Sequence, residues 1–255
     1  MNPFIKSVEN KKASLLYLMG ATWHNSCMFD LKTTEPSFAD LLNAEGIETY
    51  SFNIGGTGPD QPLREIGDQH TDNIEHALEL INEYQIEYVL GYSYGALVVS
   101  ELIDRLPSCV KGIILLDPYA VLKQDKVILL DNGDKKLVTR QQVSQDLVDY
   151  GCNITDAVKY AYLDKLSQPG TELITASYPG KHMKANFEKF SGPANIERLC
   201  SKKIVAFFTN TSNKLVRDRF PASATVFWPD STHWILLEQK RFDLAKSIAE
   251  FIDSK

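Results

Sequence analysis

The pentapeptide GYSYG at residues 91–95 constrains the fold of this chain more than any other feature. A short apolar run at residues 88–90 precedes it, and an amphipathic stretch at residues 96–106 follows it. This order predicts a buried strand that ends in a tight turn and passes directly into a helix. Such a turn exposes the Ser93 hydroxyl at the edge of a sheet, while the two glycines let the chain pass close to its neighbours. The alternative is a glycine-rich turn without chemistry, which this context disfavours.

Short apolar runs alternate with amphipathic stretches through much of the chain. Strands are predicted at residues 15–19, 47–53, 88–90, 110–116, 203–208 and 224–228. Helices are predicted at residues 36–46, 73–84 and 96–106, and a last helix carries the apolar stripe Leu244, Ala245, Ile248, Phe251 and Ile252. Buried strands separated by helices predict an α/β fold with a mostly parallel central sheet and helices on both faces.

The alternation breaks between about residues 119 and 200, a segment too long for a plain connecting loop. Residues 127–130 and 137–138 flank an Asn-Gly turn and predict a hairpin, and residues 141–150 and 156–166 predict helices. An insertion at the carboxyl edge of a parallel sheet lies over the crevice where ligands bind. We therefore expect a single domain spanning residues 1–255, with a lid at about residues 119–200.

Apolar side chains of the predicted lid allow two interpretations. They either line a site for an apolar group or build the lid's own core, and the second is favoured for most of them. The residues are Val127, Ile128, Tyr160, Tyr162, Tyr178, Phe187 and Phe190.

Charge and cysteine content limit the classes of partner. The net charge of −6 and pI of about 5.4 argue against nucleic acid or an anionic membrane as the main partner. The four cysteines have the spacing of neither a zinc site nor a secreted disulfide framework, which predicts reduced thiols. The first residues contain no apolar signal region. We expect a cytoplasmic protein that contacts neither membrane nor nucleic acid and needs no metal or other cofactor.

Taken with the serine turn, two further segments give the chain a resemblance to the α/β-hydrolase family over nearly its whole length. Residues 18–23 occupy the place of the family's first oxyanion turn, with Met19 where the family usually has His. Residues 53–58 resemble its D-x-P-G-x-G turn, with Asn53 and Gly55 in place of Asp and Pro. The resemblance implies that Ser93 is a nucleophile and that backbone amides stabilise an oxyanion. The donors implied are the amides of Ala21 and Tyr94.

A serine nucleophile needs a base, which in this family is a histidine after the last strand. Only His233, in the stretch WPDSTHW at residues 228–234, follows the last predicted strand. His24, His70, His76 and His182 fit structural or surface roles better, and His76 is expected to be solvated. The resemblance therefore implies His233 as the base.

The acidic partner of the base departs from the usual pattern. Most members carry an Asp or Glu just after the next-to-last strand, but residues 207–214, FFTNTSNK, contain no acid. The other known position is the end of the strand after the nucleophile helix, where Asp117 follows residues 112–116. An Asp-Pro pair there also serves ordinary turns and helix caps. Asp117 is the preferred candidate; Asp230, Asp218 or an Asn-assisted dyad are the alternatives.

An acid at Asp117 before a long insertion resembles the thioesterase domains and type II thioesterases of polyketide and nonribosomal peptide assembly lines. This resemblance implies hydrolysis of a thioester or ester of an apolar acyl group, either small or attached to a carrier protein or coenzyme A. Carboxylesterase, lactonase or C–C bond hydrolase activity is the alternative on the same scaffold, and a ligand-binding homologue without turnover is the alternative of another class. The candidate substrate contacts flank the predicted oxyanion turn, acid and base: Thr22, Trp23, Tyr119 and Trp234.

Overall fold

Seven strands form the main sheet of the computed structural model, which describes residues 3–20, 25–53, 70–118, 136–137, 140–165, 174–175 and 188–254. Their order across the sheet is β1-β3-β2-β4-β5-β8-β9. Among the described residues of this sheet, β1 pairs antiparallel with β3 and all other neighbouring strands are parallel. The predicted mostly parallel sheet is therefore confirmed. The strands are β1 (Phe4–Lys6), β2 (Ala13–Leu18), β3 (Ile47–Ser51), β4 (Tyr88–Tyr92), β5 (Gly112–Leu116), β8 (Ile204–Thr209) and β9 (Thr225–Trp228).

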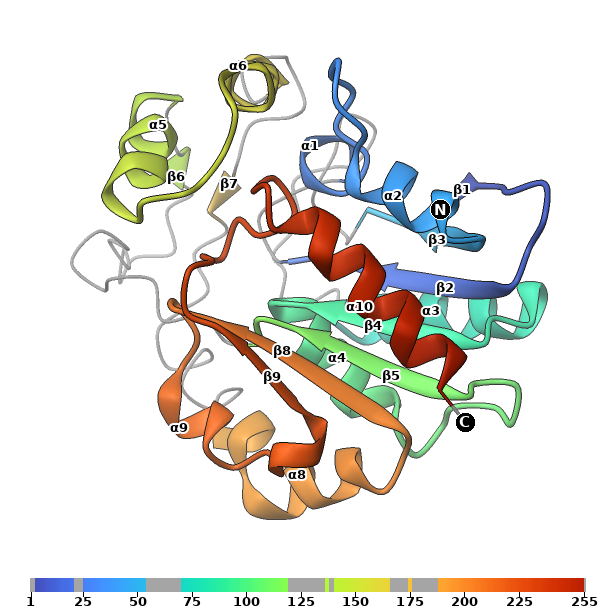
Figure 1. Cartoon of the computed structure of the whole chain (residues 1–255). Helices are drawn as coiled ribbons and strands as arrows, with labels where there is room; N and C mark the ends of the chain where they lie inside the picture. The colour runs from blue at the N-terminus through green and yellow to red at the C-terminus, as the bar shows by residue number, and fades with distance from the viewer. Residues whose placement is uncertain are drawn as a thin grey trace.

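The central strands β2, β4 and β5 are buried along their whole length, as continuous apolar runs require in a parallel sheet covered on both faces. Helices α2 (Phe38–Ala44) and α10 (Arg241–Asp253) pack together on one face, toward the viewer in Figure 1. Helices α3 (His70–Tyr84) and α4 (Tyr94–Leu102) cover the opposite face. The predicted layers of helix, sheet and helix are therefore present.

Most predicted elements appear within a few residues of their expected ends. Helix α4 begins at Tyr94, two residues before the prediction, because the helix starts directly after the turn residue Ser93. The apolar stripe of α10 faces the core through Leu244, Ala245 and Ile248. Strand β1 was not predicted, since its three residues are too few for a periodic signal. The remaining short helices of the main body are α1 (Asn25–Met28), α8 (Pro193–Cys200) and α9 (Lys214–Arg217), with a 3₁₀ turn at Ala222–Ala224.

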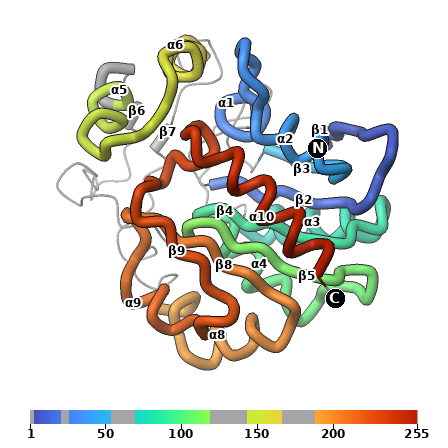
Figure 2. Tube along the Cα trace, in the orientation of Figure 1, coloured from blue at the N-terminus to red at the C-terminus, as the bar shows by residue number. Residues whose placement is uncertain are grey.

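The segment between β5 and β8 contains the two predicted helices, now α5 (Arg140–Asp149) and α6 (Asp156–Lys165). Figures 1 and 2 show both helices outside the two helix layers, near the chain that links β9 to α10. Strand β6 (Lys136–Leu137) pairs with β7 (Ile174–Thr175), a partner that the sequence did not indicate. The turn of the predicted hairpin lies outside the described residues.

Side chains of this segment divide between its interior and its surface. Tyr162 and Phe190 are fully buried and belong to the core, as the structural interpretation expected. Tyr160 is 57% exposed. Val127, Ile128, Tyr178 and Phe187 lie outside the described residues. No helix of the described chain combines the length and apolarity needed to cross a bilayer.

Candidate active site

Ser93 joins the end of β4 to the start of α4 with an unusual backbone. Its φ is +52° and its ψ is −115°, a region that L-residues rarely occupy. The Ser93 amide donates to the Leu116 carbonyl of β5 (3.0 Å), and the Ala96 amide donates to the Ser93 carbonyl (3.0 Å). Both hydrogen bonds hold the strained turn in place. The structure therefore gives Ser93 the strand-to-helix turn that its sequence context predicts.

The two glycines of the pentapeptide are required by chain crossings on either side of Ser93. A Cβ on Gly91 would lie 2.6 Å from the Gly95 carbonyl oxygen. A Cβ on Gly95 would lie 2.0 Å from the carbonyl oxygen of Leu18, at the end of β2. Backbone atoms cannot move aside as a flexible side chain can. The GYSYG sequence is thus explained by geometry, which disfavours a chance match.

Asp117 and His233 meet at the carboxyl edge of the sheet. The Asp117 carboxylate lies 2.5 Å from Nδ1 of His233, and both residues are almost completely buried. A neutral imidazole that donates Nδ1–H to this carboxylate keeps Nε2 as its proton acceptor. Asp117 also has a positive φ, +42°, and the described residues include only Gln85 and Ser93 as further non-glycine cases. Backbone strain is therefore concentrated at two of the candidate site residues.

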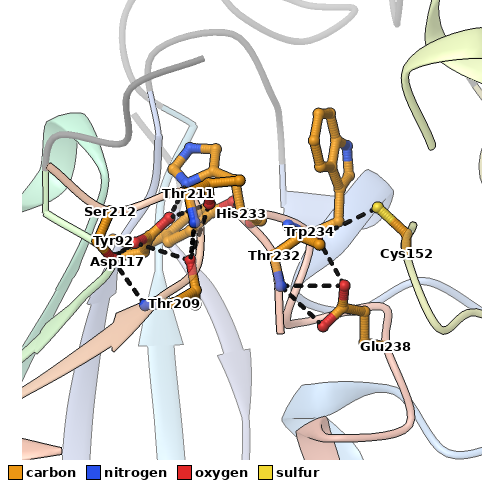
Figure 3. A network of polar contacts seen from close by, with 10 residues as sticks. All are labelled: Tyr92, Asp117, Cys152, Thr209, Thr211, Ser212, Thr232, His233, Trp234 and Glu238. Carbon is orange, nitrogen blue, oxygen red and sulfur yellow. Dashed lines mark hydrogen bonds and ion pairs between the residues drawn. The ribbon is translucent and has the colours of Figure 1, made fainter. Parts of the chain in front are cut away.

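Three hydroxyl groups from the end of β8 surround the same carboxylate (Figure 3). Thr209 donates to Oδ1 (3.1 Å), Thr211 donates to Oδ2 (3.3 Å), and Ser212 donates to Oδ1. Burial alone raises the pKa of Asp117, but hydrogen bonds from His233, Ser212 and Thr209 outweigh it and hold the pKa below its usual value. Asp117 is therefore an ionised carboxylate at neutral pH. We call Thr209, Thr211 and Ser212 the hydroxyl cradle.

The hydroxyl cradle occupies the very segment where most members of the resembled family place the acid. The sequence showed that residues 207–214 lack a carboxylate, but it did not assign its hydroxyls a role. Of the alternative acids, Asp218 is exposed and pairs with Arg217 (3.4 Å), and Asp230 is exposed. The structure therefore brings Asp117, and neither alternative, into the buried contact with His233.

Tyr92 links the serine turn to the histidine. Its hydroxyl donates to the His233 carbonyl, and its ring stacks on the imidazole with centroids 4.9 Å apart. Since Ser93 follows Tyr92 and its amide bonds to Leu116, the residue before Asp117, the three predicted catalytic residues converge on one edge of the sheet. Convergence on one sheet edge is a precondition for a serine, a histidine and an acid to act together in nucleophilic chemistry.

Tyr94 begins α4, so its amide lies at the positive end of the helix dipole beside Ser93. Its hydroxyl lies 2.5 Å from Nδ1 of His70, whose pKa is lowered by burial. A role for the Tyr94 amide as an oxyanion donor remains a prediction. The other predicted donor, Ala21, and the candidate substrate contacts Thr22, Trp23 and Tyr119 lie outside the described residues.

Trp234 and His76 have neighbours that their sequence context did not show. Trp234, a candidate substrate contact, is buried and packs against the ring of Tyr150, with centroids 5.2 Å apart. His76 is half-buried with its ring against Phe52, so the expectation of a solvated side chain was wrong. His24 and His182 lie outside the described residues.

A second buried carboxyl group, Glu238, lies on the other side of the histidine loop in Figure 3. It accepts hydrogen bonds from the Thr232 amide (3.2 Å to each oxygen) and the Thr232 hydroxyl (2.6 Å). Burial is the main cause that raises the pKa of Glu238. Glu238 could not be predicted as part of the site, because nothing in the pattern of residues 234–241 marks it as buried. Among the described residues, no group of three or more His, Cys, Asp or Glu side chains could hold a metal ion.

Comparison with solved structures identifies the fold of the chain. A serine hydrolase of the polyaromatic-hydrocarbon-degrading bacterium Cycloclasticus zankles superposes with a TM-score of 0.70 at 16% identity, over 99% of this chain and 94% of that chain. The monoacylglycerol lipase of Paleococcus ferrophilus gives a TM-score of 0.67 at 14% identity, over 99% and 98%. The thioesterase domain from the curacin biosynthetic pathway gives 0.60 at 14% identity, over 98% and 93%.

No family model matches the chain, and no curated protein matches its sequence. At identities this low the likeness to solved structures shows the fold. The chain has the α/β-hydrolase fold, as its motifs predicted.

Proposed function

We propose that this chain, with its α/β-hydrolase fold, is a serine hydrolase that cleaves a thioester or ester of an apolar acyl group. The observation that carries the proposal is the buried contact between Asp117 and Nδ1 of His233, beside the strained turn that holds Ser93. A buried, ionised carboxylate costs stability unless it is compensated, and here it orients one imidazole tautomer. A purely structural ion pair would not need a strained serine beside it.

The proposed reaction begins when Oγ of Ser93 attacks the acyl carbonyl carbon and Nε2 of His233 takes the hydroxyl proton. Asp117 stabilises the imidazolium that forms. The amide of Tyr94, and that of Ala21 by its position in the sequence, stabilise the oxyanion. The tetrahedral intermediate collapses, the leaving thiolate or alkoxide receives the proton from His233, and an acyl-enzyme remains. Water, deprotonated by His233, then attacks the acyl-enzyme and releases the acid and Ser93.

The thioester preference is the finer part of the proposal. It is supported by the acid at the end of β5, the position that resembles assembly-line thioesterases, and by the thioesterase domain among similar structures. The segment that contains α5 and α6 lies beside the histidine loop and is proposed as the lid over the acyl group. The substrate is proposed as a small acyl ester or an acyl group on coenzyme A or a carrier protein. The spacing of the four cysteines does not fit a secreted disulfide framework, and on that ground a reducing, cytoplasmic location is proposed.

A fluorophosphonate probe tests the nucleophile directly. We expect the probe to label the wild type and to leave Ser93→Ala unlabelled, since only an activated serine attacks it. An unlabelled wild type, or equal labelling of the variant, would remove the serine-hydrolase proposal in favour of a ligand-binding homologue. Thermal unfolding of both proteins shows whether the variant is folded.

Hydrolysis of a matched substrate series tests the leaving group. We expect kcat/KM for an acyl-CoA thioester to exceed that for the p-nitrophenyl ester of the same acyl group. Preference for the oxygen ester would favour the carboxylesterase alternative, and the lactonase and C–C bond alternatives are tested with substrates of those classes. Variation of the acyl chain at a constant leaving group then reports the size of the acyl site.

A further inference from the structure

Thr232 is the centre of a hydrogen-bond network that the proposed reaction does not use. Its hydroxyl donates to Glu238 at 2.6 Å. Having donated its one proton, the same oxygen accepts from the Trp234 amide at 3.2 Å and contacts Sγ of Cys152 at 3.1 Å. Cys152 is therefore the donor in that contact. Burial raises the pKa of the Cys152 thiol to about 12, so the proton needed for donation is present at neutral pH.

These contacts fix the backbone on both sides of His233. The Thr232 amide donates to the Glu238 carboxylate, and the Trp234 amide donates to the Thr232 hydroxyl. The carbonyl of His233 itself accepts from Tyr92. With these three bonds the loop cannot rotate about the histidine without breaking a buried hydrogen bond. The position of the imidazole is therefore set from the backbone as well as from Asp117.

The same network reaches the segment that joins α5 to α6. Cys152 lies in that segment, and the carbonyl of the next residue, Asn153, accepts from the Gln239 amide at 2.9 Å. The ring of Tyr150, the residue that follows α5, packs against Trp234. In Figure 3, Cys152 lies above Glu238 and both side chains are joined to Thr232 by dashed lines. The histidine loop thus touches the proposed lid through hydrogen bonds and through an aromatic contact.

We propose that Thr232 is a positioning residue for His233. Glu238 and Cys152, which lies between α5 and α6, hold Thr232 in place by hydrogen bonds. The position of the α5–α6 segment therefore controls the alignment of the base. The inference rests on the proposed function, since it assigns His233 the role of base. We call Thr232, Glu238 and Cys152 the histidine clamp. The physical basis of the proposal is that the rate falls steeply when a catalytic group is displaced by up to about 1 Å.

The chain offers matched pairs of variants that keep or remove each hydrogen bond. Thr232→Val has the shape of threonine without the hydroxyl, and Thr232→Ser keeps the hydroxyl. Cys152→Ala removes the thiol donor, and Cys152→Ser restores a donor. Cys200→Ala is the control, because Cys200 is also a half-buried free cysteine but ends α8, outside the clamp. Steady-state kinetics, thermal unfolding and the low-field imidazole proton resonance are measured for each protein.

We expect Thr232→Val to lower kcat roughly 10- to 100-fold, with a smaller change in KM, because the substrate site stays intact while the base is misaligned. Cys152→Ala should lower kcat about 3- to 10-fold, the loss of one hydrogen bond to the clamp. Thr232→Ser and Cys152→Ser should recover most of the rate, and Cys200→Ala should match the wild type. The low-field resonance of the His233 Nδ1–H proton should broaden in the variants that lose rate.

Equal kcat for Cys152→Ala, Cys200→Ala and wild type would remove the link to the α5–α6 segment. Equal rates for folded Thr232→Val and Thr232→Ser would remove the positioning role of Thr232. If Thr232→Val does not fold, Cys152→Ala decides the proposal alone. A wild type without hydrolase activity would contradict the proposed function, whereas the imidazole resonance would still report whether the clamp positions His233.

Discussion

Asp117 and Glu238 are both buried carboxyl groups next to the His233 loop, yet their environments have opposite effects on their protons. The pKa of Asp117 is lowered and that of Glu238 is raised, although burial favours the neutral form of each. Asp117 faces an imidazole and the hydroxyl cradle, whose hydrogen bonds to the charged form outweigh the loss of water. At Glu238 the bonds from Thr232 do not outweigh it. Burial alone therefore does not decide the charge of a buried carboxyl group; the hydrogen bonds that compensate for the loss of water do.

Asp117 and Glu238 also hold His233 in different ways. Asp117 contacts the imidazole ring, so it favours the tautomer with the proton on Nδ1, and in the proposed reaction it would stabilise the positive charge of the ring. Glu238 holds the backbone through Thr232, so it affects where the ring lies but not which tautomer it adopts. We expect loss of Asp117 to affect the reaction far more than any change on the Glu238 side.

The largest effect expected is that of Asp117→Asn. An amide at this position cannot stabilise the imidazolium and favours the wrong tautomer, so we predict a loss of kcat of about 10⁴-fold. Pre-steady-state release of the leaving group should slow with the steady state, since acylation itself needs the base. The matched controls are Asp218→Asn and Asp230→Asn, which remove the exposed alternative acids. A comparable loss in either control, with an active Asp117→Asn enzyme, would contradict the assignment.

The next largest effect concerns the hydroxyl cradle. The double variant Thr211→Val and Ser212→Ala removes two donors from Asp117 and should lower kcat about 10- to 100-fold, at roughly tenfold per hydrogen bond. Because these bonds favour the carboxylate form, the pKa of Asp117 should rise, and the acid limb of the pH-rate profile should change. Thr225→Val and Ser201→Ala remove hydroxyls that bond outside the site and serve as controls. Equal pH profiles for all four proteins would show that the cradle is only structural.

The residues on the two sides of His233 differ in how well the sequence predicted them. Ser93, Asp117 and His233 each lie at or after the end of a predicted strand, and strand ends of a parallel sheet meet at one edge. Their convergence therefore followed from topology. The hydroxyls of residues 209–212 gave a partial signal, since polar residues replaced an expected acid. Their role needed the observed contact with Asp117.

The contacts of Glu238, Thr232 and Cys152 gave no such signal in the sequence. Thr232 and Cys152 are 80 residues apart, and no periodic pattern joins them. The pairing of β6 with β7 likewise depends on long-range contact, so the sequence indicated two helices of the inserted segment but not its strand partner. Local patterns predict elements well, whereas contacts between distant irregular segments depend on tertiary packing.

Asp117 and Glu238 should change the free energy of unfolding with pH in opposite directions. The folded pKa of Asp117 lies below the unfolded value of about 3.9, so its contribution is present above that value and is lost as the pH falls. The folded pKa of Glu238 lies above its unfolded value of about 4.3, so ionisation in the folded protein costs stability as the pH rises. The stability advantage of wild type over Asp117→Asn should therefore grow as the pH rises toward about 4. Its advantage over Glu238→Gln should shrink above about pH 4.

Urea unfolding of the three proteins in steps of half a pH unit measures both slopes. Opposite signs are expected, and two slopes of the same sign would contradict the opposed environments. His70→Gln is the control, because it removes a half-buried titrating group that contacts Tyr94 and neither of the two carboxyl groups. The size of each slope gives the number of protons exchanged on unfolding.

The smallest effect expected comes from Gly151, which precedes Cys152 and has a φ of +67° with open space around its Cα. In Gly151→Ala the new methyl group meets no neighbour, so the cost is backbone strain of about 1 kcal/mol, or a fall of about 2–4 °C in Tm. Strain relieved by a shift of Cys152 should reach His233 through Thr232 and lower kcat two- to threefold. Gly46→Ala, at a φ of +80° between α2 and β3, imposes backbone strain outside the clamp. Its new methyl group would also lie 3.0 Å from the Lys12 side chain and 3.2 Å from the Asn10 carbonyl oxygen, so its loss of stability should be at least as large. If both variants lose stability but only Gly151→Ala loses rate, the α5–α6 segment acts on the base; equal rates would contradict the link between this segment and His233.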